Sequence, residues 1–314
     1  MNIKIKKLIE KANKIIILRH KDPDIDALGS QLGFCSSLKQ AYPKKTILAV
    51  GDTNSLNTFQ PMDTATREEY KESLVFIFDT VSKQMLLGSD YTEAKNLVLV
   101  DHHLNEPDIR YDYYVRDARA SSSCEIVYQL LKDMRIAIPQ IAAKYLLMGI
   151  ISDTGRFLYN NVNSDTFDIS GKLIKIGANI QEIFDVMYSE SLEMKKIKAY
   201  FFSTVQYTKN NVAFRKNDED FLKKYHIDVH TASRGLVNQM AGANEVPIWA
   251  NFTFDNRIGK ILCELRSHTI SIVDIAHKYG GGGHAQACGC TVDTWEDTDK
   301  VLADLDLVAE VSHG

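Results

Sequence analysis

The chain has 314 residues, of which 45% are hydrophobic and 25% charged, an ordinary composition for a soluble globular protein with room for two domains. Its net charge of -4 excludes a broad basic face, so we expect no binding of long nucleic acid through phosphate charges. No apolar run approaches the ~18 residues of a membrane span, and the N-terminus lacks the apolar core of a signal peptide. With five scattered cysteines, these features predict a cytoplasmic protein without disulfides.

The first half of the chain alternates between strand and helix patterns. Apolar residues at helical spacing predict helices over residues 2–12, 26–41, 123–134 and 139–151. Short apolar runs predict buried strands over residues 14–18, 46–50, 74–78 and 97–100. Strands separated by helices are typical of an α/β domain, with a mostly parallel sheet and helices on both faces. Residues 51–73 are polar and irregular, and their sequence predicts no element.

After about residue 164 the pattern changes to that of a smaller α+β domain. Helical patterns cover residues 166–176, 180–188, 190–200 and 271–279. Strand patterns cover residues 212–215, 247–254 and 260–266, and a hairpin turn is expected at residues 255–259. The last helical pattern leads into Gly280-Gly281-Gly282-Gly283-His284.

Three of the predicted strands are followed directly by acidic and imidazole side chains: His20, Asp24 and Asp26 after the first strand, Asp79 after the third, and Asp101, His102 and His103 after the fourth. Ligands of open α/β sheets bind at the carboxyl ends of the strands, so these side chains are expected to meet there. One acidic turn alone would be an ordinary strand ending, but three groups at one edge favour a cation site. Imidazoles with carboxylate oxygens suit Mn²⁺ or Mg²⁺ better than structural zinc, which prefers thiolates.

Two later motifs complete a recognisable order. Asp153 lies within Ile150-Ile151-Ser152-Asp153-Thr154-Gly155-Arg156-Phe157, and the run Gly280–His284 follows far downstream. With the three strand-end groups, they resemble the DHH phosphoesterase family, in the subfamily whose DHH domain precedes a DHH-associated domain. Within it, the chain looks most like the small nanoRNase and 3'-phosphoadenosine 5'-phosphate phosphatase type. The resemblance implies a DHH catalytic domain over residues 1–188, a helical linker over 189–201 and a substrate-binding domain over 202–314.

The resemblance also implies a metal-binding set: His20 and Asp24 on one cation, Asp26, His102 and Asp153 on a second, and Asp79 between the two. Two cations ~3.5–4 Å apart activate water and bind the phosphoryl oxygens of an in-line displacement. A shared carboxylate is a natural way to hold cations that close. The expected cofactor is two Mn²⁺ per chain, with Mg²⁺ as the alternative.

The remaining site residues concern substrate. The resemblance implies that His103 contacts the scissile phosphate or protonates the leaving oxygen, with a solvent-facing turn histidine as the alternative. It also implies a phosphate-binding set of Arg266, Gly282, Gly283 and His284, whereas a helix C-cap is the simpler explanation of the glycines. The segment 121–125, Ser-Ser-Ser-Cys-Glu, indicates a helix N-cap.

Together these features predict a metal-dependent hydrolase of very short oligoribonucleotides, acting also on 3'-phosphoadenosine 5'-phosphate. A cyclic or linear dinucleotide phosphodiesterase and an exopolyphosphatase-like hydrolase would use the same metal chemistry. A non-catalytic nucleotide-binding sensor is the alternative from another class, and the complete set of metal-binding side chains argues against it. The sequence is compatible with a homodimer and leaves the oligomeric state open.

Overall fold

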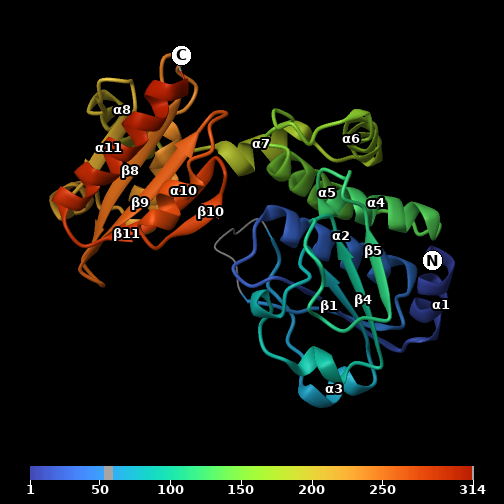
Figure 1. Cartoon of the computed structure of the whole chain (residues 1–314). Coiled ribbons are helices and arrows are strands. Elements are labelled where there is room, and N and C mark those ends of the chain that lie inside the picture. The colour runs from blue at the N-terminus through green and yellow to red at the C-terminus, as the bar shows by residue number, and fades with distance from the viewer. Residues whose placement is uncertain (53–58, 313–314) are drawn as a thin grey trace. The chain divides into compact units, whose positions relative to one another are not determined.

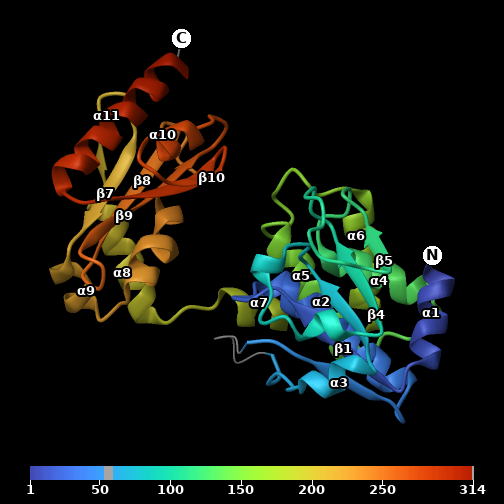
Figure 2. The ribbon, with the colours of Figure 1, turned by 60° about the horizontal axis from the view of Figure 1, so that its bottom comes forward.

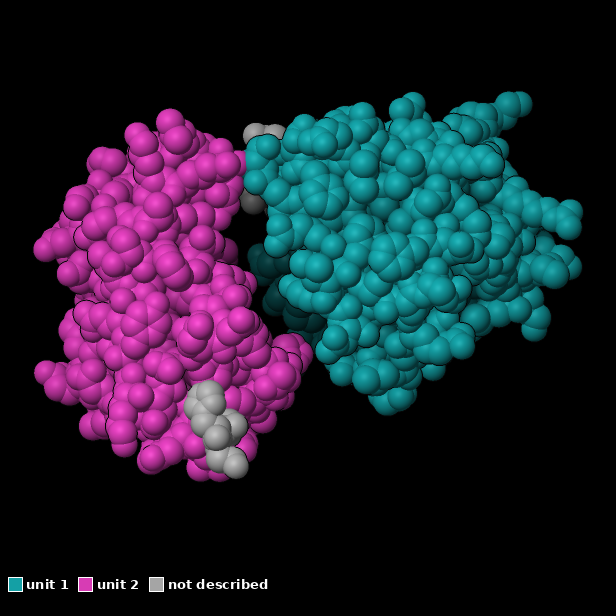
Figure 3. All heavy atoms as spheres, turned by 90° about the horizontal axis from the view of Figure 1, so that it is seen from above, with its two compact units in different colours: residues 1–189 teal, residues 190–314 magenta. Residues whose placement is uncertain are grey.

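The computed structural model describes residues 1–52 and 59–312 and contains two compact units. The first unit comprises residues 1–189 and the second residues 190–314 (Figure 3). Each unit has its own sheet (Figure 1). Among the described residues, none of the helices has the length and hydropathy needed to cross a membrane.

The first unit is built on a parallel sheet with strand order β2-β1-β3-β4-β5. Its strands are β1 (Lys14–Arg19), β2 (Thr46–Ala49), β3 (Leu74–Phe78), β4 (Asn96–Asp101) and β5 (Tyr113–Arg116). Strands β1, β3 and β4 are almost completely buried because both faces of the sheet are covered, as their continuous apolar runs predict. The mostly parallel sheet expected from the sequence is therefore confirmed.

Longer helices cover one face of this sheet (Figure 1). The helices of the unit are α1 (Asn2–Lys11), α2 (Ile25–Ala41), α3 (Arg67–Lys71), α4 (Ser123–Asp133), α5 (Gln140–Asp153), α6 (Ser164–Ile176) and α7 (Ile180–Tyr188). Helices α2, α4 and α5 pack tightly against one another, and α5 needs glycine at position 149. A Cβ there would lie 2.3 Å from the sulfur of Cys124 and 2.8 Å from a carboxylate oxygen of Asp26. This close packing brings α4 and α5 up to the N-terminal end of α2.

Shorter elements cover the opposite face of the first sheet. Tyr70 of α3 and Tyr91 of a single 3₁₀ turn, Asp90–Glu93, pack there on Val75 and Ile77 of β3. The part of residues 51–73 that the structure describes contains α3 and an isolated bridge between Val50 and Asp63. The other residues of that unassigned stretch, 53–58, lie outside the described residues.

The second unit contains a mixed sheet with strand order β10-β11-β9-β8-β7-β6. Its strands are β6 (Gln206–Tyr207), β7 (Ala213–Asn217), β8 (Ile248–Asp255), β9 (Lys260–Ser267), β10 (Gly282–His284) and β11 (Ala287–Val292). Only β7 and β8 run parallel; the other neighbours are antiparallel. The predicted hairpin turn joins β8 to β9, with Gly259 in a left-handed conformation at φ 65°.

Helices cover both faces of the second sheet. They are α8 (Leu192–Ser203), α9 (Glu219–Tyr225), α10 (Val273–Lys278) and α11 (Trp295–Ser312). Helices α10 and α11 lie on one side of the sheet, and α8 and α9 on the other (Figure 2). Ala250 and Phe252 of β8 belong to the core that α10 and α11 cover. Trp249, one residue earlier, points to the opposite core, where Phe201 of α8 and Phe221 of α9 lie. The alternation of a strand's side chains thus gives each face its own apolar layer.

Candidate metal centre

The predicted metal-binding side chains come together at the carboxyl ends of the strands in the first unit. His20 follows β1, Asp24 caps α2, Asp26 lies in its first turn, Asp79 follows β3, His102 follows β4 and Asp153 ends α5. They form two groups, each with ligand atoms within 4.8 Å of one another: His20, Asp24 and Asp79, and Asp26, His102 and Asp153. A third group of this kind consists of Asp79, His102 and His103. The six side chains of the expected metal-binding set therefore lie close together, and His103 lies beside them.

Asp79 lies between the two groups. One of its carboxylate oxygens is 3.5 Å from Nε2 of His20, and the other is 3.6 Å from Nε2 of His102. Nε2 of His102 is also 3.3 Å from a carboxylate oxygen of Asp153, and Nε2 of His20 is 3.9 Å from a carboxylate oxygen of Asp24. Asp79 adopts a left-handed backbone conformation, with φ at 60°, and is only 3% exposed. The geometry allows this one carboxylate to serve both groups.

Each of the two imidazoles directs its Nε2 atom toward the carboxylates. Nδ1 of His20 is 2.8 Å from the carbonyl oxygen of Lys21, which can only accept, so Nδ1 carries a proton and Nε2, which faces Asp79, is the nitrogen that could bind a cation. Nε2 of His102 is buried and has no hydrogen-bond partner among the described residues. A buried nitrogen without a partner is costly, and a cation between the carboxylates would satisfy it. The donor set therefore fits divalent cations.

Electrostatic repulsion supports the same conclusion. Burial raises the pKa of Asp26 well above its ordinary value, and the nearby Asp79 and Asp153 raise it further. Burial, followed by repulsion from Asp79 and Asp24, raises the pKa of Asp153 to about 8. These carboxylates are therefore difficult to ionise together in the protein alone. Cations placed among them would remove the repulsion and keep them ionised.

The N-terminus of α4 orients two of the candidate metal-binding carboxylates. The backbone N–H groups of Ser123 and Cys124 donate to the two carboxylate oxygens of Asp26, at 2.7 and 3.0 Å. The hydroxyl of Ser123 donates to Asp79 at 2.9 Å. The cap expected at residues 121–125 is present as well, since Ser122 accepts from the N–H of Glu125. Sequence reasoning found the cap but missed the contacts with Asp26 and Asp79.

A second support holds the loop between His20 and Asp24. The buried guanidinium of Arg19 donates to the carbonyl oxygen of His20 at 2.9 Å, and to both the carboxylate and the carbonyl oxygen of Asp52. The other carboxylate oxygen of Asp52 accepts the N–H of Asp22 at 2.8 Å, where φ is 49°. Gly51 leaves room for this arrangement, because a Cβ would lie 2.9 Å from the guanidinium carbon. We call the contacts of Arg19 with His20 and Asp52, and of Asp52 with Asp22, the Arg19 brace. The sequence alone did not predict it.

His103 is oriented from both its side chain and its backbone. Nδ1 lies 2.8 Å from a carboxylate oxygen of the buried Asp101, and this hydrogen bond raises the pKa of His103 to about 9. Arg116 donates to the carbonyl oxygens of His103 and Leu104, at 3.1 and 2.7 Å. The imidazole of His103 is half exposed beside Asp79, so it can reach a substrate.

The predicted phosphate-binding residues lie in the second unit, around a cavity of about 600 Å³. Arg266, Gly282 and Gly283 line it, whereas the exposed His284 ends β10 outside its wall. Two glycines of this run, Gly280 and Gly281, are also required by the local backbone. Gly280 ends α10 with φ at 73°, and a Cβ on Gly281 would meet the carbonyl oxygen of Gly289 at 2.0 Å. The C-cap interpretation therefore holds for Gly280, and Gly282 and Gly283 are strand residues.

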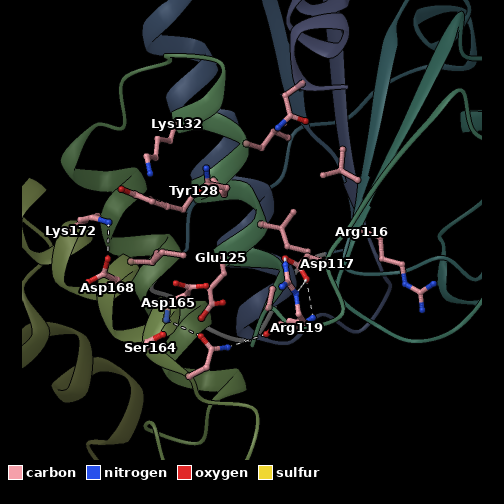
Figure 4. A pocket seen from close by; sticks show the side chains of 18 of the residues that line it. Arg116, Asp117, Arg119, Glu125, Tyr128, Lys132, Ser164, Asp165, Asp168 and Lys172 are labelled. Atoms are coloured by element: carbon pink, nitrogen blue, oxygen red, sulfur yellow. Dashed lines mark hydrogen bonds and ion pairs between the residues drawn. The ribbon is translucent and has the colours of Figure 1, made fainter.

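The first unit also contains a cavity of about 690 Å³ away from these ligands, along β5, α4 and α6 (Figure 4). Opposite charges on its wall pair with one another: Arg119 with Asp117, and Lys172 with Asp168 (Figure 4). None of the predicted metal-binding side chains lines it. Because this cavity contains none of the clustered imidazole and carboxylate groups, the metal centre is the better candidate for chemistry.

Comparison with known proteins identifies the class of enzyme. The chain matches the DHH family, N-terminal domain, over residues 14–150 and the DHHA1 domain over residues 218–310. Together with the full-length similarity given below, this shows that the chain belongs to the DHH family of metal-dependent phosphoesterases. It is a hydrolase acting on phosphoester bonds. The predicted family and enzyme class are confirmed.

Individual members of the family resemble this chain along its whole length. The chain is 32% identical over 314 residues to the bifunctional oligoribonuclease and PAP phosphatase NrnA of Bacillus subtilis (strain 168), covering 99% of each chain. It is 31% identical over 304 residues to the protein of the same name from Mycoplasma pneumoniae, covering 94% of this chain and 93% of the other. The solved structure of an exopolyphosphatase-related protein from Bacteroides fragilis superposes with a TM-score of 0.84 at 22% identity, covering 98% and 95% of the two chains. That structure confirms the fold.

Proposed function

We propose that this protein hydrolyses very short oligoribonucleotides to mononucleotides with two Mn²⁺ ions, and that it also removes a phosphate from 3'-phosphoadenosine 5'-phosphate. Relatives at about one-third identity along the full chain carry both activities in their names, which supports this choice of substrates. The net charge of -4 also suits short substrates, because a long strand would need a broad basic face.

The observation that carries the proposal is the position of Asp79 between two ligand groups. His20 and Asp24 would hold one cation, and Asp26, His102 and Asp153 the other. When bound, such a pair of cations supplies Lewis-acid chemistry, activating water and withdrawing charge from the phosphoryl group. The protein's own contribution is to hold six side chains at fixed separations, through the Ser123 contact and the Arg19 brace.

The donor set favours Mn²⁺ as the working ion. Two imidazoles among four carboxylates are softer than the all-oxygen sites that Mg²⁺ and Ca²⁺ prefer. Mg²⁺ should support weaker turnover, and Ca²⁺ should bind without supporting efficient hydrolysis.

His103 is the residue we assign to the leaving group or the scissile phosphate. Asp101 holds Nδ1 of its ring, so the imidazole keeps one orientation while its other nitrogen is available to substrate. Arg266 and the cavity in the second unit are assigned to substrate phosphate. This division predicts that loss of His103 affects chemistry and that loss of Arg266 affects substrate capture.

The experiment is a substrate panel on the full chain: a 5'-phosphorylated diribonucleotide, 3'-phosphoadenosine 5'-phosphate, a cyclic dinucleotide and polyphosphate. Each is measured after chelation and after return of Mn²⁺. We expect Mn²⁺-dependent release of mononucleotides from the first and of phosphate from the second. Asp79→Ala should abolish both activities and lower metal content. Asp168→Ala, which removes an exposed acid of α6 in the same unit, is the matched control and should behave as wild type.

Three outcomes would contradict the proposal. Turnover of polyphosphate or a cyclic dinucleotide in preference to the first two substrates would make the protein a different phosphoesterase. Tight nucleotide binding without turnover, with Mn²⁺ present, would make it a sensor. Normal turnover by Asp79→Ala would remove the two-metal assignment.

A further inference from the structure

A buried carboxylate holds two arginines together in the second unit. One carboxylate oxygen of Glu264 accepts from Nε of Arg234 at 3.0 Å, and the other accepts from Nη2 of Arg266 at 2.9 Å. The Glu264 side chain is 11% exposed, Arg266 is 20% exposed and Arg234 is 66% exposed. All three side chains line the cavity of about 600 Å³. Two like charges are therefore fixed side by side at the wall of a cavity large enough for a nucleotide.

The backbone beneath Arg234 is built to hold it there. Arg234 lies in a π-helical turn, Thr231–Gly235, and such turns occur frequently at functional sites. The completely buried Asn251 donates from its amide to the carbonyl oxygens of Ala232 and Ser233, at 2.8 and 2.6 Å. The unusual backbone turn is therefore anchored to β8, directly before the residue that reaches Glu264.

Arg266 is fixed as firmly, yet some of its N–H donors have no hydrogen-bond partner in the part of the chain that the structure describes. Its Nη1 donates to the carbonyl oxygens of Leu265 and Cys288, at 2.8 and 3.2 Å, and its Nη2 donates to Glu264. A guanidinium has five N–H donors, and these three contacts use three of them. The remaining donors, with those of the more exposed Arg234, can bind an anion in a bidentate manner.

The charges of this wall favour a phosphate. Arg234 and Arg266 together carry two positive charges and Glu264 one negative charge, so the cluster attracts anions. Arg257 also lines the cavity, but both carboxylate oxygens of Asp255 hold its guanidinium, at 2.9 and 2.7 Å. The charge of Arg257 is already paired with Asp255, so a variant of Arg257 is a suitable control for a variant of Arg234.

We propose that Arg234 and Arg266, spaced by Glu264, form a two-arginine site for the terminal phosphomonoester of a nucleotide. Arg234 is the added specificity residue and Glu264 a positioning residue. The site rests on the proposed function in that it would bind the terminal phosphate of a short oligonucleotide. Without the Glu264 bridge, the two guanidiniums would repel each other and separate. A phosphomonoester, with two negative charges at neutral pH, would be bound in preference to an unphosphorylated nucleoside.

The test is calorimetric binding of adenosine 5'-monophosphate and of adenosine to the full chain after chelation of metals, so that neither turnover nor metal binding contributes. The wild type should bind the monophosphate more tightly than the nucleoside. Arg234→Gln should weaken monophosphate binding by about ten- to a hundredfold and leave adenosine binding unchanged. Arg257→Gln removes the same charge from the same cavity wall and should have a much smaller effect. Equal losses in both variants would reduce the site to general electrostatic attraction.

Glu264→Gln separates positioning from simple charge balance. If Glu264 only offsets positive charge, its removal should tighten monophosphate binding; the proposal requires weaker binding, because the arginines lose their spacing. Arg234 is mostly exposed, so Arg234→Gln should fold even if Glu264→Gln does not, and its result decides alone. Wild-type binding by Arg234→Gln in a chain that cleaves dinucleotides would overturn this site and leave the proposed function intact. If the predicted binding losses occur but the protein cleaves no oligonucleotide, the phosphate site stands and the proposed function is wrong.

Discussion

Replacement of Ser123 by alanine should weaken metal binding more than it weakens the fold. The Ser123 hydroxyl donates a 2.9 Å hydrogen bond to Asp79, and the two side chains are 0% and 3% exposed. A hydrogen bond to a charged group contributes about 1.5–3 kcal/mol, and loss of a partner that orients a metal ligand lowers metal affinity about 10–100-fold. We therefore expect Ser123→Ala to bind Mn²⁺ about ten- to a hundredfold more weakly, measured by calorimetry on chelator-treated protein.

The neighbouring serine provides a matched control. Ser122 is equally buried, but its hydroxyl accepts the N–H of Glu125 at 3.2 Å and caps α4. Ser122→Ala should lower the free energy of unfolding by roughly 0.5–2 kcal/mol with little change in metal affinity. Equal losses of Mn²⁺ affinity in the two variants would show that α4 acts only through its overall position. Wild-type affinity in Ser123→Ala would refute an orienting role for the hydroxyl.

Three further predictions follow from the metal centre. Asp52→Asn should lower Mn²⁺ affinity about tenfold, because it weakens the carboxylate contacts with Arg19 and Asp22. Asp63→Asn, which removes an acid bonded to the N–H of Ala49 at the end of β2, should not, and comparable losses in calorimetry would refute the role of Asp52. His103→Ala should lower kcat far more than it changes KM while metal content stays normal, and loss of metal would instead identify His103 as a ligand. The pKa of Asp153 in the folded protein is raised to about 8, so between about pH 4 and 8 the folded metal-free protein holds a proton that the unfolded chain has lost. The metal-free protein should therefore lose stability as pH rises over that range. Thermal unfolding without Mn²⁺ measures this, and rising stability would contradict it.

The elements that the sequence predicted well are those with an unambiguous apolar pattern. The strand at residues 74–78 and the helix at residues 180–188 have the predicted bounds, because a fully buried strand and a strongly amphipathic helix are distinctive. Strand β5 gave no such signal: it lies at the sheet edge and only Val115 of its four residues is buried. The glycines of β10 likewise lack the β-branched residues that mark a strand.

The sequence also indicated some residues of the site and not others. Those that follow a buried strand, such as Asp79, could be placed because a parallel sheet brings its carboxyl ends to one edge. Partners contributed by distant segments could not be placed. Ser123 lies 44 residues from Asp79 in sequence, and Arg19 lies 33 residues from Asp52. For Ser123 a simpler local explanation also existed, since the segment 121–125 is already accounted for as a helix cap.

The ligand set explains why metal binding and folding should be coupled in this protein. Two of the proposed ligands also complete helix N-termini: Asp24 accepts the N–H of Ala27 at the start of α2, and Asp26 accepts the first N–H groups of α4. These N–H groups partly offset the negative charge, so the carboxylates can be brought together as the chain folds. The offset is incomplete, since the pKa of Asp153 stays raised to about 8. The unbalanced charge that destabilises the metal-free protein is therefore the same charge that the proposed cations would neutralise.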